Sequence, residues 1–177
     1  MTMATDPHIE FSTADGVCTV RIERPAKRNA LTGSMYAALA AAFIAADADE
    51  NVRAVVFTGN PQAFTGGNDL ADFLHQPPSR QDAPGFRFMR ALSDCRKPVV
   101  AAVCGPAVGI GTTLLLHCDF VYVANDAKLS TPFVKLGLVP EYASSLLMPA
   151  CLGHVRAAEW LLLGEVFSGE QAAALGL

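Results

Sequence analysis

Two glycine-rich segments of this 177-residue chain have the residue types best suited to chemistry. Residues 64–69 read Phe-Thr-Gly-Gly-Asn-Asp, and residues 105–111 read Gly-Pro-Ala-Val-Gly-Ile-Gly. Each is expected to leave a strand and enter a helix, which exposes backbone N–H groups that can converge on one developing negative charge. Glycine also lets a ligand approach the backbone closely. Tight turns use glycine for conformational reasons alone, so the pattern by itself leaves both interpretations open.

Neither segment matches a common nucleotide-binding signature. Residues 105–111 lack the GxGxxG spacing, and no Lys-Ser or Lys-Thr pair completes a phosphate-binding loop. The four histidines share no metal-ligand spacing, and the five cysteines contain no CxxC pair. We therefore predict no metal site, and we expect the cysteines to be reduced and mostly buried.

The composition is that of one globular domain spanning residues 1–177. Hydrophobic residues make up 51% of the chain and charged residues 17%, which is enough apolar material for one core. A net charge of −4 leaves no basic surplus for a phosphate backbone, so nucleic acid is not an expected partner. The sequence shows no secretory signal and no run of roughly 18 apolar residues, so a cytoplasmic protein without a membrane partner is expected.

The elements that must position the two loops alternate between strands and helices, which favours an α/β fold. Residues 17–23 alternate apolar and polar side chains as a half-buried strand does, and residues 34–49 have apolar side chains at helical spacing. Residues 76–84 are expected to form a surface loop, and residues 168–171 resemble a capping box. The other expected strands are 53–58, 99–103 and 120–124, and the other expected helices are a short one from Leu70, 86–94, 112–117, 142–148 and 155–163.

Three motifs follow one another along the chain: residues 24–31 (Arg-Pro-Ala-Lys-Arg-Asn-Ala-Leu), residues 63–70 (Ala-Phe-Thr-Gly-Gly-Asn-Asp-Leu) and residues 105–111. In this order they resemble the signatures of the enoyl-CoA hydratase/isomerase (crotonase) superfamily. The resemblance covers nearly the whole chain. It implies a crotonase-like spiral of β-β-α units that binds acyl-CoA and assembles as a homotrimer or a dimer of trimers.

The resemblance also implies how a coenzyme A thioester would bind as substrate, with no separate cofactor. The backbone N–H groups of Asn68 and Ile110 would hold the thioester oxygen as it becomes an enolate. Gly66 matches the residue whose main chain grips the adenine end. The CoA phosphates would lie against Ala26, Lys27 and Arg28, and the remaining substrate-binding residues would be Gly67, Asp69, Leu70, Gly109 and Phe133.

Simpler explanations exist for several polar residues. A solvated basic turn explains Lys27 and Arg28 equally well, and the position of Asp69 favours a role as the N-cap of the helix from Leu70. Outside the motifs, His75 is expected on the surface, His117 in a packed position, and Trp160 in the core or a subunit contact.

The residues at two positions narrow the range of reactions that the resemblance allows. Hydratases of this superfamily use two glutamates, because adding water to a double bond requires activating the water and delivering a proton to carbon. The matching positions here hold Thr113 and Phe133, neither of which can take a proton as a carboxylate does. Ordinary hydration therefore loses support.

Glu141 is the candidate base. Residues 131–145 resemble a segment of peroxisomal-type 3-enoyl to 2-enoyl-CoA isomerases, in which the glutamate after a proline is the catalytic base, and Glu141 follows Pro140. Phe133, Leu138 and Val139 are expected to form an apolar pocket that raises its pKa. The alternative explanation is structural, because a carboxylate just after a proline in the first turn of a helix is favoured by the helix dipole.

The predicted reaction is therefore the shift of a 3-enoyl-CoA double bond to the 2-enoyl position through a stabilised dienolate, as in fatty acid metabolism. Two alternatives stay open: an enoyl-CoA hydratase or another enolate-forming enzyme whose base lies elsewhere, and a non-catalytic acyl-CoA-binding interaction module. The resemblance also implies a C-terminal helical segment after Leu177 that this chain does not contain. A longer chain or a neighbouring subunit would then cover the apolar surface left exposed.

Overall fold

A five-stranded sheet forms the centre of the computed structural model, which describes residues 5–75 and 82–177. Strands β1 and β2 are antiparallel, and each later pair in the sheet is parallel. Parallel neighbours need long crossover connections, and helices and the two glycine-rich loops lie in those connections. In spatial order the strands are β1 (Ile9–Ala14), β2 (Val17–Ile22), β3 (Ala54–Thr58), β4 (Val99–Val103) and β6 (Phe120–Val123).

The hairpin between β1 and β2 is closed by Asp15 and Gly16, whose φ angles are 50° and 79°. Two consecutive positive φ values define the type of tight turn that Asp-Gly favours between antiparallel strands. Strand β1 was not predicted from the sequence. Five of its six residues are exposed, so its side chains lack the alternation that marks a half-buried strand.

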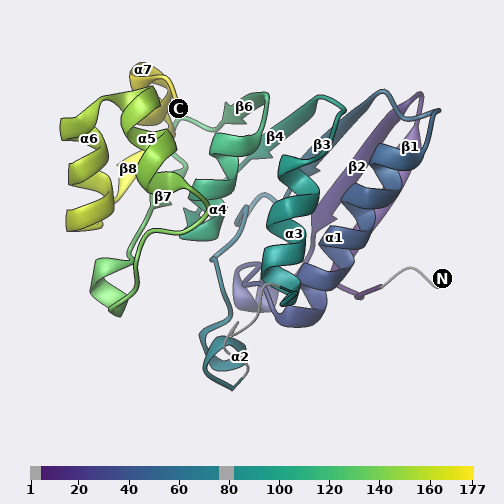
Figure 1. Cartoon of the computed structure of the whole chain (residues 1–177), viewed down its shortest axis with the longest axis horizontal. Helices are drawn as coiled ribbons and strands as arrows, with labels where there is room; N and C mark the ends of the chain where they lie inside the picture. The colour runs from purple at the N-terminus through teal and green to yellow at the C-terminus, as the bar shows by residue number, and fades with distance from the viewer. Residues whose placement is uncertain (1–4, 76–81) are drawn as a thin grey trace.

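Two helices cover one face of the sheet (Figure 1). Helix α1 (Gly33–Ala48) and helix α3 (Pro84–Ser93) lie side by side there, and Thr32 caps α1 by accepting a hydrogen bond from the Met35 N–H. Fully buried aromatic rings join the helices to the sheet. Phe43 of α1 packs edge-on against Phe57 of β3 at 5.5 Å between ring centroids, and Phe57 lies 6.1 Å from Phe88 of α3.

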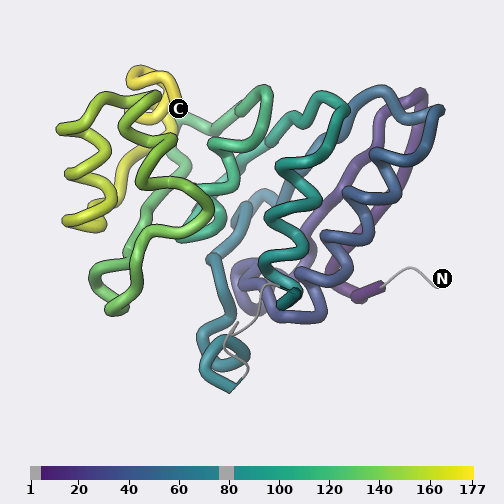
Figure 2. The backbone as a smooth tube through the Cα atoms, viewed as in Figure 1, coloured from purple at the N-terminus to yellow at the C-terminus, as the bar shows by residue number. Residues whose placement is uncertain are grey.

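A second, three-stranded sheet lies on the C-terminal side of the molecule. Figure 2 shows the chain running from the N-terminal hairpin on one side to the C-terminal helices on the other. β5 pairs in parallel with β7, and β7 pairs antiparallel with β8. The elements of this half are β5 (Ala107–Val108), α4 (Ile110–Thr113), η2 (Leu114–His117), β7 (Lys128–Ser130), η3 (Val134–Leu136), α5 (Ser144–Leu152), α6 (His154–Ala158), the π-helical turn η4 (Glu159–Leu163), β8 (Phe167–Ser168) and α7 (Gly169–Leu175).

The predicted α/β class is confirmed, and β2, β3, β4, β6, α1 and α3 lie within two residues of their expected positions. The predicted capping box is also present: the Ser168 hydroxyl accepts from the Gln171 N–H, and the Gln171 side chain accepts from the Ser168 N–H. The helix expected at 112–117 instead begins at Ile110 and tightens into the 3-10 turn η2. Of the surface loop expected at 76–84, residues 76–81 lie outside the described residues.

The expectation for the cysteines was wrong in one respect. All five carry free thiols, but Cys104 and Cys151 are exposed and only Cys18 is fully buried. Trp160 is a core residue as predicted, stacked on Phe167 at 3.4 Å between ring centroids. None of the helices in the described part of the chain is long and apolar enough to cross a bilayer.

Candidate active site

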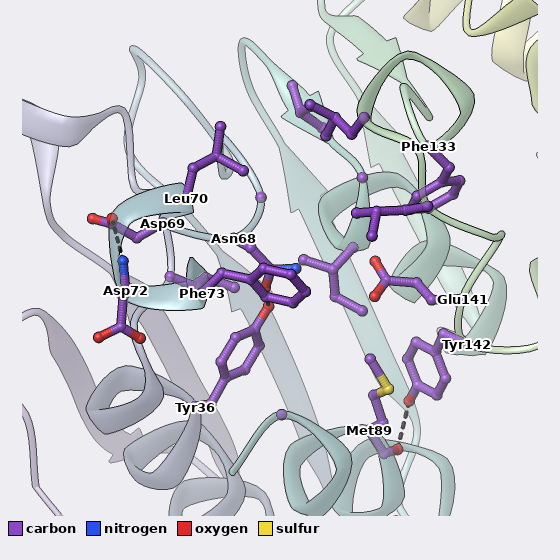
Figure 3. A pocket seen from close by; sticks show the side chains of 18 of the residues that line it. Tyr36, Asn68, Asp69, Leu70, Asp72, Phe73, Met89, Phe133, Glu141 and Tyr142 are labelled. Carbon is purple, nitrogen blue, oxygen red and sulfur yellow. Dashed lines mark hydrogen bonds between the residues drawn. The ribbon is translucent and has the colours of Figure 1, made fainter. Parts of the chain in front are cut away.

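A cavity of about 820 Å³ lies where the two glycine-rich loops face residues 132–142 (Figure 3). This volume falls within the range of small-molecule and cofactor sites. Its walls also include Tyr36 from α1, Phe73 from α2 (Leu70–His75) and Met89 from α3. No sequence pattern marks these three residues, because each is an ordinary apolar position on a helix.

Backbone hydrogen bonds hold the two loops side by side. The N–H groups of Phe64 and Thr65 donate to Pro106 O at 3.0 and 3.1 Å, and the Val108 N–H donates to Thr65 O at 3.0 Å. Gly67 completes the contact, because a Cβ at this position would lie 2.7 Å from Val108 O and its φ is +84°. A larger residue at Gly67 would force the loops apart.

The Asn68 N–H points away from the segment around Leu31, with which Asn68 pairs. Leu31 and Asn68 form a parallel bridge in which the Leu31 N–H donates to Gly67 O and the Asp69 N–H donates to Leu31 O, both at 2.8 Å. In a parallel ladder the residue between those two bonds has its own N–H on the opposite side. The Asn68 N–H donates to no group among the described residues, and Asn68 lines the cavity.

The Ile110 N–H also has no acceptor in the described part of the chain, for a different reason. Ile110 is the first residue of α4, and the first N–H groups of a helix have no intrahelical acceptor. Gly109 makes this start possible with φ 58° and ψ −116°, a conformation that residues with a Cβ rarely adopt. The two residues that bear these amides line one cavity, which is a requirement for a two-donor site that holds an oxyanion.

Glu141 faces this site from the opposite wall. In Figure 3 its carboxylate points away from its own backbone into the cavity, toward the side that holds Asn68 and Phe73. The carboxylate makes no hydrogen bond or ion pair with the described residues. Burial raises the pKa of Glu141 to about 7, which suits a group that must both accept and return a proton near neutral pH.

The helix-dipole explanation of Glu141 is wrong, because α5 begins three residues later, at Ser144. Tyr142 and Ala143 intervene in the left-handed region, with φ 51° and 54°, and the Ser144 N–H and hydroxyl both donate to Glu141 O. The main chain of Glu141 thus closes a turn before the helix. Its side chain lies outside the first helical turn, where the dipole acts.

The apolar residues expected around Glu141 all line the same cavity as its side chain. Phe133 is 4% exposed, whereas Leu138 is 38% and Val139 81% exposed, so Phe133 is the most deeply buried of the three. Tyr36, Phe73 and Met89 supply further wall.

The Asn68 side chain is fixed by Tyr36. The Tyr36 hydroxyl donates to Asn68 Oδ1 at 2.5 Å. Burial, and secondly the negative charge of Glu141, raise the pKa of Tyr36 well above its ordinary value, so the hydroxyl keeps its proton and stays a donor. The Asn68 amide NH₂ is consequently left facing the cavity (Figure 3).

Asp69 caps α2, as its position predicted. Its Oδ1 accepts from the N–H groups of Ala71 and Asp72 at 3.1 and 3.3 Å, and its Oδ2 is 2.8 Å from Arg24 Nη1. The bond from Arg24 holds the pKa of Asp69 below its ordinary value. Asp69 and the 53%-exposed Leu70 both line the cavity, but the Asp69 carboxylate is already engaged.

The basic turn η1 (Pro25–Lys27) lies beside the site, but Ala26, Lys27 and Arg28 are exposed and do not line the cavity. The turn is tied to the first loop by the Gly66 N–H, which donates to Arg28 O at 2.8 Å. The buried Asn29, which follows the turn, anchors the turn to the rest of the fold. Its side-chain NH₂ donates to three backbone carbonyls, those of Ile22, Ala63 and Phe64. No cluster of His, Cys, Asp or Glu among the described residues could hold a metal ion.

The chain belongs to the enoyl-CoA hydratase/isomerase family, whose model matches residues 12–177, and its α/β architecture is that of crotonase-fold structures. It is 36% identical over 172 residues to the enoyl-CoA hydratase ACTT3 of Alternaria alternata, covering 96% of this chain and 58% of the relative. It is 38% identical over 175 residues to enoyl-CoA delta isomerase 2 of Rattus norvegicus, covering 96% and 44%. Among solved structures, Pseudomonas aeruginosa OdaA is 56% identical with a TM-score of 0.94, covering 97% of this chain and 69% of that one.

The chain spans roughly half to two thirds of the length of these relatives. Proteins named as hydratases and as isomerases match it about equally well, so the comparisons define an acyl-CoA family without selecting the reaction. Only the groups of the site itself can distinguish the two reactions.

Proposed function

We propose that this chain isomerises a 3-enoyl-CoA to the 2-enoyl-CoA, with Glu141 as the base and the N–H groups of Asn68 and Ile110 as the donors that hold the thioester oxygen. The observation that carries the proposal is that one cavity is lined by two residues whose amides, and by one glutamate whose carboxylate, have no partner among the described residues. Burial raises the pKa of this glutamate to about 7.

The reaction balances with these groups alone. The Glu141 carboxylate removes a proton from the α carbon of the 3-enoyl thioester, and the electron pair delocalises onto the thioester oxygen as a dienolate. The two N–H groups stabilise this oxyanion, and a donor of this kind is worth about 3 to 4 kcal/mol. Glu141 then returns the same proton to the γ carbon, leaving the double bond between the α and β carbons.

The other binding residues are assigned with the thioester oxygen at the two N–H groups and the α carbon at Glu141. The exposed cations of Lys27 and Arg28 next to Gly66 are suited to CoA phosphates, and the main chain of Gly66 to the adenine end. The thioester and the acyl chain would lie against residues that line the cavity: Gly67, Leu70, Gly109 and Phe133. Assembly into trimers and a cytoplasmic location stay predictions.

Hydration, or another enolate-based reaction, is the second candidate, supported by the similarity to a protein named as a hydratase. The site gives it less support. Thr113 is fully buried and does not line the cavity, and Phe133 is apolar. Three other carboxylates line the cavity. Asp69 is held by Arg24, Asp72 Oδ2 accepts from the Gly33 N–H at 2.8 Å, and Asp82 is not free either.

Product analysis tests the function directly. The purified chain is incubated separately with a 3-enoyl-CoA and a 2-enoyl-CoA, and the products are separated by chromatography and identified by mass. We expect the 3-enoyl substrate to yield a 2-enoyl product of unchanged mass. A 3-hydroxyacyl product from the 2-enoyl substrate would instead establish hydration, and binding without turnover of either thioester would establish an acyl-CoA-binding module.

The pH dependence follows from Glu141. The base must be deprotonated to take the α proton, so kcat/KM for the 3-enoyl substrate is expected to rise with pH and to level off above a midpoint near the Glu141 pKa of about 7. Steady-state rates measured from about pH 5.5 to about pH 8.5 check this. A rate that is already level across this range, as the ordinary glutamate pKa of 4.5 would produce, would contradict burial of the base.

A further inference from the structure

Beside Glu141 lies a cluster of polar side chains that none of the roles above uses, and one of its members, Tyr142, also lines the cavity (Figure 3). The rings of His117 and Tyr142 stack with centroids 3.6 Å apart and planes 13° apart. His117 Nε2 lies 2.9 Å from Tyr142 O. A carbonyl oxygen can only accept, so Nε2 carries the hydrogen and donates it to the main chain of the residue directly after the base.

The same cluster reaches helix α3. The Tyr142 hydroxyl donates to Met89 O at 2.6 Å and lies 3.0 Å from Ser93 Oγ, which is itself 3.3 Å from His117 Nδ1. Each polar atom of the two rings therefore has a partner. Tyr142 is fixed by its ring, its hydroxyl and its main chain at once.

The position of His117 gives the cluster a link to the other half of the site. α4 runs directly into η2, so one short helical segment begins with the Ile110 N–H and ends with His117. The bond from His117 to Tyr142 O therefore connects the helix that bears one oxyanion donor to the turn that bears the base. Helical geometry keeps the two ends of this segment at a fixed separation.

The turn needs such support. Tyr142 and Ala143 are consecutive non-glycine residues with positive φ, and each left-handed residue costs roughly 1 kcal/mol or more. Such a conformation persists only when its surroundings over-determine it. The stacked ring and the three polar contacts of Tyr142 are the surroundings that do so here.

We propose that His117, Tyr142 and Ser93 are positioning residues, which hold the Glu141 carboxylate in register with the Ile110 amide through a strained turn. The inference rests on the proposed function, since a positioning role requires Glu141 to be the base. It differs from a packing role in its consequence. Loss of the cluster should misplace the base in a chain that remains folded, and a displacement of about 1 Å can lower a rate about 100-fold.

Four variants separate the two roles. Tyr142→Phe keeps the stacked ring and removes both hydroxyl contacts, and His117→Ala removes the donor to Tyr142 O. His117→Gln restores a donor of similar reach without the ring. Ala143→Gly is the matched control, because it relieves the same kind of backbone strain in the same turn without touching the cluster.

The experiment measures kcat and KM for a 3-enoyl-CoA together with the melting temperature of each variant. We expect Tyr142→Phe and His117→Ala to lower kcat about 10- to 100-fold with KM within about twofold of the parent chain, at temperatures well below melting. His117→Gln should recover part of the kcat that His117→Ala loses. Ala143→Gly should keep kcat within about twofold.

The inference is overturned if the cluster variants lower the melting temperature while kcat at low temperature stays at the parent value. The variant Glu141→Gln, measured in parallel, distinguishes failure of the positioning role from failure of the proposed function. If Glu141→Gln abolishes turnover and the cluster variants do not reduce kcat, the positioning role alone fails. If Glu141→Gln retains turnover, the proposed function fails, and the positioning role fails with it.

Discussion

Glu141→Gln is expected to lower kcat for a 3-enoyl-CoA by roughly 1000-fold, within the range that general acid–base catalysis contributes. The glutamine amide has nearly the shape of the carboxylate but cannot take the α proton at neutral pH. The binding of a saturated acyl-CoA should change little, since the two amides and the cavity walls are unaltered. Rate measurements on the 3-enoyl substrate, beside calorimetric titration with the saturated thioester, check both parts.

The same variant is expected to melt at a higher temperature than the parent chain above pH 7. The folded-state pKa of Glu141 is about 7, above its ordinary value of 4.5, because burial disfavours the charge. A raised acid pKa means that the stabilisation it contributes is complete below about pH 4.5 and is lost as the pH rises to about 7. Glutamine is neutral throughout, so it avoids this loss. A variant that loses activity and also melts lower at pH 8 would indicate structural damage, and the rate loss would then say nothing about catalysis.

Ile110→Pro is expected to lower kcat/KM by about 100- to 1000-fold, the loss measured when one oxyanion-hole donor is removed. Proline has no N–H, so the substitution deletes the proposed donor itself. The backbone tolerates it, because Ile110 is the first residue of α4, where proline fits, and Gly109 is outside the α region that proline disfavours in its predecessor. Steady-state kinetics of the folded variant provide the measurement.

Ile110→Ala is the matched control for this substitution. Ile110 is 1% exposed, and truncating a buried isoleucine costs about 2 to 5 kcal/mol of stability whichever small residue replaces it. Alanine keeps the N–H, so it should share the lower melting temperature of the proline variant and lose far less activity. Equal rates for the two variants would show that the Ile110 amide holds no developing charge.

The sequence predicted the parts of this fold whose residues carry a local signal. The alternation of 17–23 and the short apolar runs of 53–58 and 99–103 gave β2, β3 and β4, because burial of one or both strand faces dictates side-chain type directly. The two loops were recognisable because Gly67 and Gly109 are required by close approach or by a positive φ. The family assignment followed from the order of the three motifs and is confirmed.

The rest of the site depended on contacts between distant segments. Tyr36 lies in the middle of α1, and nothing in its neighbourhood indicates that its hydroxyl reaches Asn68, 32 residues later. His117 and Tyr142 are 25 residues apart, and the sequence around each residue does not indicate that their rings stack. The predicted start of α5 at residue 142 was wrong, because Tyr142 and Ala143 adopt left-handed conformations that are uncommon for their residue types.

Both proposed oxyanion donors are main-chain groups, held in place by the ladder between Thr65, Pro106 and Val108. A peptide N–H is present whatever amino acid the codon specifies, proline excepted. Substitutions other than proline at positions 68 and 110 therefore change the wall of the cavity, and with it the proposed acyl specificity, while both proposed N–H donors stay in place. Under the proposed function, a protein with this fold can acquire new substrates during evolution and keep the groups that bind the oxyanion.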